Sequence, residues 1–283
     1  MSQTTITDVD RELKAKHRAM WALGDYATVA NELIPALGEV LVESCGVGPT
    51  TRVLDVGAGS GNAAIPAALA GANVVASDLT PELLLEGARL AGQRGAALTW
   101  DEGDAEALPY DDASFDVVMS CVGVMFAPHH QDAADELVRV CRPGGTIGLL
   151  SWTPSGFIGQ LFAVMKPFAP PPPTGASPAP LWGDEQHVRG LLGERVGEIV
   201  ADRRSLLVDQ FGTGEAFRDY FKENYGPTVA VYRSIADDPG RVEALDHAIA
   251  DLARRHQRAD GSMDWEYLLV TATRSQCPAS ESL

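Results

Sequence analysis

Three glycines and two carboxylates at fixed spacing form the pattern in this chain that is best suited to chemistry. The glycines are Gly57, Gly59 and Gly61; Asp55 lies two residues before the first, and Asp78 lies seventeen residues after the last. Glycines let a backbone approach a ligand closely, and free N–H groups at the start of a helix favour negative charge. A carboxylate at the end of the next strand can accept hydrogen bonds from ribose hydroxyls. The pattern predicts a site for a nucleoside-containing cofactor.

A strand, a turn, a helix and a second strand are needed to bring these residues together. An apolar run over 52–56 precedes the glycine turn, an Ala- and Leu-rich stretch follows it, and a second apolar run over 74–76 leads to Asp78. The whole unit, residues 52–78, has the size of a βαβ crossover. Such units bind ligands at the carboxyl ends of their strands, which is where the sequence puts the glycine turn.

The glycine spacing bears on the kind of cofactor. A dinucleotide fingerprint, Gly-x-Gly-x-x-Gly, requires a third glycine at position 62, which is Asn62. This difference speaks against an NAD-dependent oxidoreductase. A glycine-rich turn taken alone could also be a purely structural, tight connection from strand to helix. The rest of the sequence is needed to choose between a structural turn and a cofactor-binding one.

The composition indicates a globular protein and excludes some classes of binding partner. Of the 283 residues, 45% are hydrophobic and 22% are charged, which suits a globular protein with a real core. The formal net charge of −17 opposes binding to nucleic acid or to an anionic membrane, because both are negatively charged. The sequence has no apolar run of about 18 residues, no signal-peptide core and no cysteines at metal-ligand spacing. We expect a cytoplasmic monomer or homodimer without a membrane span, structural disulfides or a bound metal.

Alternating strand and helix patterns predict the fold class. Five apolar runs separated by helices or loops occupy residues 52–152, which is typical of a parallel, doubly wound sheet. Two further strands are expected over 197–210 and 264–274. We divide the chain into N-terminal helices or a lid (1–49), a cofactor-binding core (50–152), the rest of the sheet with a helical cap (153–274) and a disordered polar tail (275–283).

The N-terminal region has two predicted helices with an aromatic segment between them. The first covers residues 10–20, Gly24 breaks it, and apolar spacing predicts a single second helix over 28–45. Trp21 and Tyr26 lie at the break. They either hold the N-terminal helix on the core or form part of a lid over the cofactor.

Four separated segments together resemble one enzyme family. VLDVGAGSGN, VVASD, EGDAEALPYDDASFDVV and ELVRVCRPGGTIGLLSW occur in the order and spacing of the class I S-adenosylmethionine (SAM) methyltransferases, and the chain looks most similar to their UbiE/COQ5-like (Methyltransferase type 11) group. The resemblance covers about residues 50–152. It implies an α/β, doubly wound, Rossmann-like sheet of seven strands with an antiparallel last strand, N-terminal helices and a helical cap insertion.

The resemblance also implies roles for the matching residues. The glycine loop and Asp55 would hold the methionine portion of SAM, Asp78 would take the ribose hydroxyls, and Leu79 would pack on the adenine. Asp104 and Ala105 would read the adenine edge; the alternative for Asp104 is a loop carboxylate that caps its own turn. The expected cofactor-binding residues are Trp21, Tyr26, Asp55, Gly57, Ala58, Gly59, Gly61, Asn62, Asp78, Leu79, Asp104, Ala105 and Cys121.

Methyl transfer itself demands few side chains, because holding the two reactants in line can supply ~7–11 kcal/mol. A general base helps when the acceptor is a hydroxyl. His129 and His130, which follow the fourth strand, and Tyr26 are the candidate catalytic residues on the acceptor side, and His17 is a weaker candidate for the same edge. The alternative for the two histidines is that they simply begin a surface helix. Residues 153–260 would form a cap or acceptor pocket.

The function we predict is transfer of the methyl group of SAM to a small, hydrophobic or aromatic acceptor, with O-methylation favoured and S-adenosylhomocysteine (SAH) as the product. C-methylation of a quinone-like ring is the alternative within the same class. From other classes, a non-catalytic SAM-binding protein and an NAD-dependent oxidoreductase stay open at this point.

Overall fold

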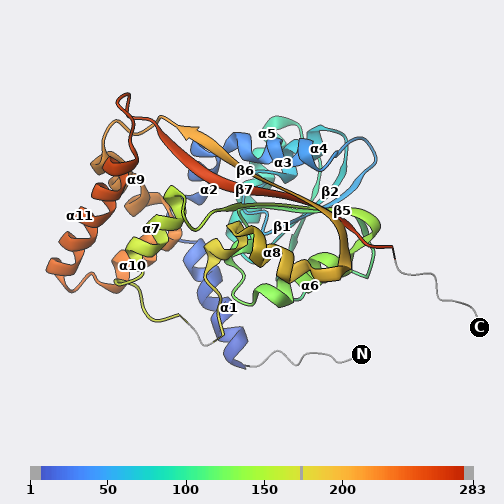
Figure 1. The fold of residues 1–283 in the computed structure, drawn as a ribbon, viewed down its shortest axis with the longest axis horizontal. Coiled ribbons are helices and arrows are strands. Elements are labelled where there is room, and N and C mark those ends of the chain that lie inside the picture. The colour runs from blue at the N-terminus through green and yellow to red at the C-terminus, as the bar shows by residue number, and fades with distance from the viewer. Residues whose placement is uncertain (1–7, 173–174, 277–283) are drawn as a thin grey trace, which may run out of the picture.

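The computed structural model describes residues 8–172 and 175–276, and a seven-stranded sheet lies at its centre (Figure 1). The strands follow the order β3-β2-β1-β4-β5-β7-β6. Strands β1 to β5 pair in parallel, whereas β7 is antiparallel to both of its neighbours. This confirms the predicted doubly wound sheet with an antiparallel last strand. The strands are β1 (Arg52–Val56), β2 (Asn73–Asp78), β3 (Thr99–Glu102), β4 (Phe115–Cys121), β5 (Cys141–Trp152), β6 (Val196–Val208) and β7 (Met263–Arg274).

Helices cover both faces of the sheet (Figure 1). On one face lie α3 (Pro35–Ser44), α4 (Ala64–Leu69) and α5 (Pro81–Arg94); on the other lie α6 (His130–Val140) and α8 (Glu185–Leu192). The change of face follows because crossovers between parallel strands are right-handed and the strand order reverses between β1 and β4. Doubly wound sheets bind their ligands at this switch point. Within residues 8–172 and 175–276, none of the helices has the length and apolar character needed to cross a membrane.

The expectation of a single helix over residues 28–45 is wrong. Helix α2 (Tyr26–Leu33) ends before Ile34, and α3 begins at Pro35. Proline lacks the N–H that a helix interior needs, and its ring disfavours a helical conformation in the preceding residue. Ile34 accordingly adopts φ −127° and ψ 27°. The break leaves α2 as a separate short helix, whose first residue is Tyr26.

A helical cap lies at one end of the sheet, beside the last residues of β6 and the first residues of β7 (Figure 1). Its helices are α7 (Phe157–Met165), α9 (Gly214–Asn224), α10 (Gly226–Ser234) and α11 (Pro239–His256). Buried aromatic rings form its interior: Phe157 stacks on Trp265 with ring centroids 5.7 Å apart, and the centroids of Phe217 and Phe221 are 4.2 Å apart. Much of the aromatic content after β5 therefore forms the core of the cap itself.

The N-terminal helix α1 (Asp8–Trp21) lies beside the cap helix α10 and along the loops at the carboxyl ends of the strands (Figure 1). The segment after α1 is tied to the cap by backbone bonds. Asp25 donates its N–H to the Asn224 carbonyl at 3.0 Å, and Gly24 forms an isolated β-bridge with Tyr225. These contacts fix the position from which Tyr26 begins α2.

Candidate cofactor and acceptor site

A cleft opens at the carboxyl ends of β1, β2, β3 and β4, beneath α1. The cleft has a volume of about 80 Å³ and is partly open to solvent. The fold thus brings together segments that are far apart in the chain. Of the residues predicted from the sequence, those that line the cleft are Trp21, Tyr26, Gly57, Gly59, Asp78, Leu79, Asp104 and Ala105. Those that do not are Asp55, Ala58, Gly61, Asn62, Cys121, His129 and His130.

The glycine turn has a backbone that other residues adopt only with strain. Gly57 and Gly59 have φ values of 66° and 55°. A Cβ atom at Gly57 would also lie 2.9 Å from the backbone of Gly123, because the turn packs directly on the segment that follows β4. Glycine is needed at position 57 both for the positive φ and for this close approach.

The carboxylate of Asp78 is held in place by two backbone N–H groups. Gly59 donates to Oδ2 at 2.8 Å, and Thr80 donates to Oδ1 at 2.8 Å. Burial raises the pKa of Asp78, although these hydrogen bonds oppose the rise. The bonds orient the carboxylate at the rim of the cleft and leave lone pairs free to accept hydrogen bonds from a ligand.

Asp55 is a buried carboxyl group without a hydrogen-bond partner. The residue is 1% exposed, and neither carboxylate oxygen accepts a hydrogen bond from the described residues. Burial raises its pKa to about 8; the nearby Ala64 N–H opposes this, and the charge of Asp78 adds to it. A buried polar group that is left unpaired is costly, so its persistence points to a ligand that completes it.

The end of β4 is strained where it meets the glycine turn. Val122 has φ 56°, which is a rare conformation for a β-branched residue and one that clusters at functional sites. The Ser120 hydroxyl fixes this region: it donates to the Val56 carbonyl at 2.5 Å and accepts from the Val124 N–H at 2.8 Å. Val122 and Val124 both line the cleft. The strained segment therefore forms the cleft wall beside the glycine turn.

Beyond β3, Asp104 makes two kinds of contact. Its Oδ1 accepts from the Glu106 N–H at 3.0 Å, which is the self-capped turn weighed as the alternative role for this residue. Its Oδ2 accepts from the ammonium of Lys14 on α1. Asp104 nevertheless lines the cleft, as do Ala105 and Leu79, so turn capping does not exclude a ligand contact.

Aromatic rings form the wall of the cleft beneath α1 and α2. The ring of Trp21 lies edge-on to Phe126 at 4.6 Å and to Tyr26 at 5.2 Å between centroids, and Tyr225 of the cap lies 5.9 Å behind it. Tyr26 also lies against the glycine turn, because its Cε1 would be 3.3 Å from a Cβ at Gly59. The cleft beside the glycine turn is thus lined by aromatic rings.

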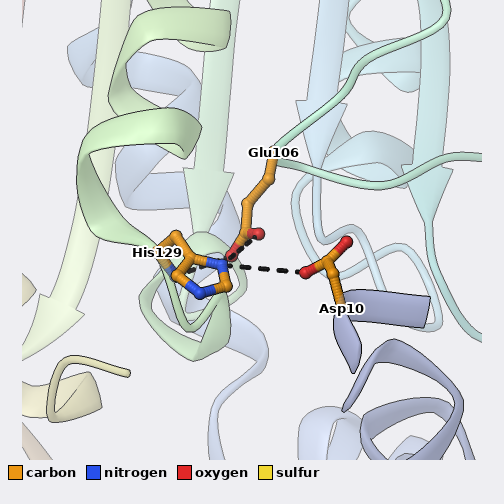
Figure 2. Close-up of side chains that lie close together, drawn as sticks. All are labelled: Asp10, Glu106 and His129. Atoms are coloured by element: carbon orange, nitrogen blue, oxygen red, sulfur yellow. Dashed lines mark hydrogen bonds and ion pairs between the residues drawn. The ribbon is translucent and has the colours of Figure 1, made fainter. Parts of the chain in front are cut away.

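The two candidate histidines lie outside the cleft. His130 is 2% exposed; its Nδ1 is 2.9 Å from His187 Nε2, and burial, with a smaller contribution from His187, lowers its pKa to about 4. His129 has its Nδ1 2.8 Å from Glu106 Oε2 (Figure 2). His17 on α1, a weaker candidate from the sequence, lines the cleft instead.

Sequence reasoning missed Lys14, Val124 and Phe126 as cleft residues. A signal for Lys14 was present, because Lys14, His17 and Trp21 follow each other at spacings of three and four and so share one face of α1. The sequence offers no comparable signal for the unusual conformation of Val122.

Comparisons with known proteins agree with this geometry. Residues 54–149 match a family model described as a methyltransferase domain. An uncharacterized protein of Mycobacterium tuberculosis is 51% identical over 265 residues, which cover 94% of this chain and 96% of that protein. The demethylmenaquinone methyltransferase of Deinococcus radiodurans is 41% identical over 116 residues, or 39% of this chain and 48% of that protein. The YcgJ protein of Bacillus subtilis has a similar fold, with a TM-score of 0.55 at 17% identity over 86% of this chain and 99% of that one.

Proposed function

The chain belongs to the class I SAM-dependent methyltransferases, in the Methyltransferase type 11 group, and we propose that it moves the methyl group of SAM to an oxygen atom of a small hydrophobic or aromatic molecule. The observation that carries the proposal is the composition of the cleft. One wall consists of the glycine turn and Asp78, and the other carries the rings of Trp21, Tyr26 and Phe126.

The residues at the switch point fit the methionine end of SAM. Asp55 is a buried, unpartnered carboxyl group beneath the glycine turn, and the ammonium group of SAM has the charge that would complete it, directly or through water. The turn offers backbone rather than side chains where Gly57 and Gly59 line the cleft, so a ligand can approach closely.

The nucleoside end fits the other half of the cleft. Asp78, oriented by Gly59 and Thr80, would accept hydrogen bonds from the ribose hydroxyls. Leu79 would pack on the adenine ring, and Asp104 and the Ala105 N–H would read its edge. These roles of individual residues are proposals that rest on their place in the cleft.

The acceptor side is proposed to lie against the aromatic wall. SAM, when bound, supplies an electrophilic methyl group on a sulfonium. The rings of Trp21, Tyr26 and Phe126 would hold an apolar acceptor in line with that methyl group and exclude water from it. Burial raises the pKa of Tyr26, so its hydroxyl stays protonated at neutral pH and serves as a hydrogen-bond donor.

An O-methylation also requires that the acceptor hydroxyl lose a proton. His17 is the histidine best placed for this step, because it lines the cleft and because burial lowers its pKa, which keeps the imidazole neutral and able to accept a proton. His129 and His130 stay candidates only if the start of α6 moves, since neither lines the cleft.

Measurement of SAH release with a panel of phenols, quinones and amines tests this proposal. We expect SAH with phenols. SAH with quinones alone would instead favour C-methylation, as in the demethylmenaquinone methyltransferase that the core resembles. Calorimetric binding of SAM without SAH from any acceptor class would indicate a non-catalytic SAM-binding protein.

A further inference from the structure

Helix α1 presents a charged face to an acidic segment at the end of β3. Asp10, Lys14 and Arg18 follow at intervals of four residues and so share one face of the helix. Glu102, Asp104 and Glu106 lie opposite them. The two sets of charges belong to segments some ninety residues apart in the chain, and their pairing holds α1 against the segment after β3.

The pairing is centred on Lys14. Its ammonium donates to Asp104 Oδ2 and lies 2.7 Å from Glu106 Oε2, and the side chains of Lys14 and Glu106 are only 11% and 5% exposed. Arg18 pairs with Glu102 at 2.7 Å, but these two side chains are 41% and 53% exposed. Buried pairs are harder to break than exposed ones, because each partner left alone keeps a desolvated charge. Of these two ion pairs, the one made by Lys14 is therefore the stronger contact between α1 and the segment after β3.

Asp10, Glu106 and His129 offer the ligand types of a divalent metal site, with their ligand atoms within 4.8 Å of one another (Figure 2). Lys14 argues against a metal. Its ammonium lies 2.7 Å from Glu106 Oε2, the same oxygen that faces His129 Nδ1, and 3.8 Å from Asp10 Oδ1. The Lys14 ammonium already occupies the position of a cation in this cluster. The cluster therefore acts as an electrostatic contact between α1 and the segment after β3.

The position of Lys14 has a consequence for the cofactor. The carboxylate of Asp104, proposed above for the exocyclic amine of adenine, is the one that Lys14 holds. The space enclosed beneath α1 is about 80 Å³, whereas ligand pockets commonly measure roughly 300–1,000 Å³. Burial alone would lower the pKa of Lys14, but its bonds to Asp104 and Glu106 outweigh this and keep the ammonium charged.

We propose that α1 is a latch, fastened by Lys14 on Asp104 and Glu106, which narrows the cleft and must release Asp104 before the adenine of SAM can take its place. The proposal rests on the cofactor assignment made under the proposed function. In this proposal, the rate at which SAM enters the cleft depends on the ion pairs of Lys14 with Asp104 and Glu106, which take no part in methyl transfer.

The test compares three variants by stopped-flow measurement of SAM association. Lys14→Met removes the charge of the side chain and keeps most of its length. Lys16→Met is the matched control, because Lys16 is an exposed residue of the same helix and the change in net charge is the same. Arg18→Met weakens the exposed end of the latch without altering a cleft residue. Hydrogen exchange of the α1 amides, measured without SAM, reports the latch independently of binding.

We expect Lys14→Met to speed SAM association roughly threefold to tenfold relative to Lys16→Met, with Arg18→Met giving a smaller increase. The α1 amides should exchange faster in Lys14→Met than in the control. Association no faster than in Lys16→Met would overturn the latch. If neither the wild type nor any variant bound SAM, the proposed function would be wrong. The hydrogen exchange of α1 would still test the latch, and equal exchange in Lys14→Met and Lys16→Met would reject it.

Discussion

The backbone N–H of Gly59 donates to Asp78 Oδ2 at 2.8 Å, so the turn after β1 and the end of β2 form one rigid unit. The turn that would hold the methionine portion of SAM and the carboxylate that would hold its ribose are therefore fixed relative to each other before any ligand binds. Such preorganisation lowers the entropy cost of binding.

Replacement of Asp78 by Ala should weaken SAM binding more than about tenfold, which corresponds to about 1.4 kcal/mol, because the ribose hydroxyls lose their acceptor and the Gly59 N–H loses its partner. Calorimetry measures the affinity, and circular dichroism checks that the fold survives. Asp237→Ala, at an exposed position of the cap, serves as the control and should bind SAM normally. An unchanged affinity of Asp78→Ala would refute the role of Asp78.

Binding of SAM at pH 7 should release a proton from Asp55. The folded-state pKa is raised to about 8, so the free carboxyl group is mostly protonated at pH 7, and a nearby ammonium then favours its ionised form. Calorimetry in buffers of different ionisation enthalpy should give roughly 0.5–1 proton released per SAM, and the release should disappear in Asp55→Asn. Equal proton release in both proteins would contradict the pairing of Asp55 with the ammonium.

The sequence predicted that the glycine turn and Asp78 would lie together, for a physical reason. Gly57, Gly59 and Asp78 belong to one short βαβ unit, so local spacing determines their arrangement. The strands of the core were predicted for the same reason, since apolar runs of strand length alternate there with helices.

The aromatic wall of the cleft was predicted only in part, because its residues meet through tertiary contacts. Trp21, Phe126 and Tyr225 come from three distant segments, and no spacing links them. The His130 side chain is turned away from the cleft toward His187, fifty-seven residues later, which no local pattern reveals. Pro35 is a residue that ends or begins helices, but the apolar periodicity on both sides of it favoured one continuous helix.

Two Gly→Ala replacements should have opposite effects on stability. Gly57→Ala introduces a Cβ 2.9 Å from Gly123 at a positive φ, so it should destabilise the fold by about 1–3 kcal/mol and abolish SAM binding. Gly92→Ala, in an exposed part of α5 with open space around it, should stabilise the protein by roughly 0.5–1 kcal/mol. Urea denaturation measures both. A Gly57→Ala protein as stable as the wild type would show that the turn is not constrained.

Replacement of individual histidines should separate the candidate bases. His17→Ala should lower the kcat of O-methylation roughly 100-fold, in line with the loss of a general base, and should remove the acidic limb of the pH–rate profile. His129→Gln, outside the cleft, should change kcat by less than about threefold, the size of a modest indirect effect. A large loss of kcat in His129→Gln with little change in His17→Ala would instead assign the role of general base to His129.

The most direct test of the account is transfer of a deuterated methyl group from SAM to a panel of phenols, quinones and amines, followed by mass spectrometry and NMR of the product. The account predicts that SAH forms with hydrophobic phenols and that the label resides on oxygen. A label found on carbon or nitrogen, or the absence of SAH with every acceptor class, would contradict it.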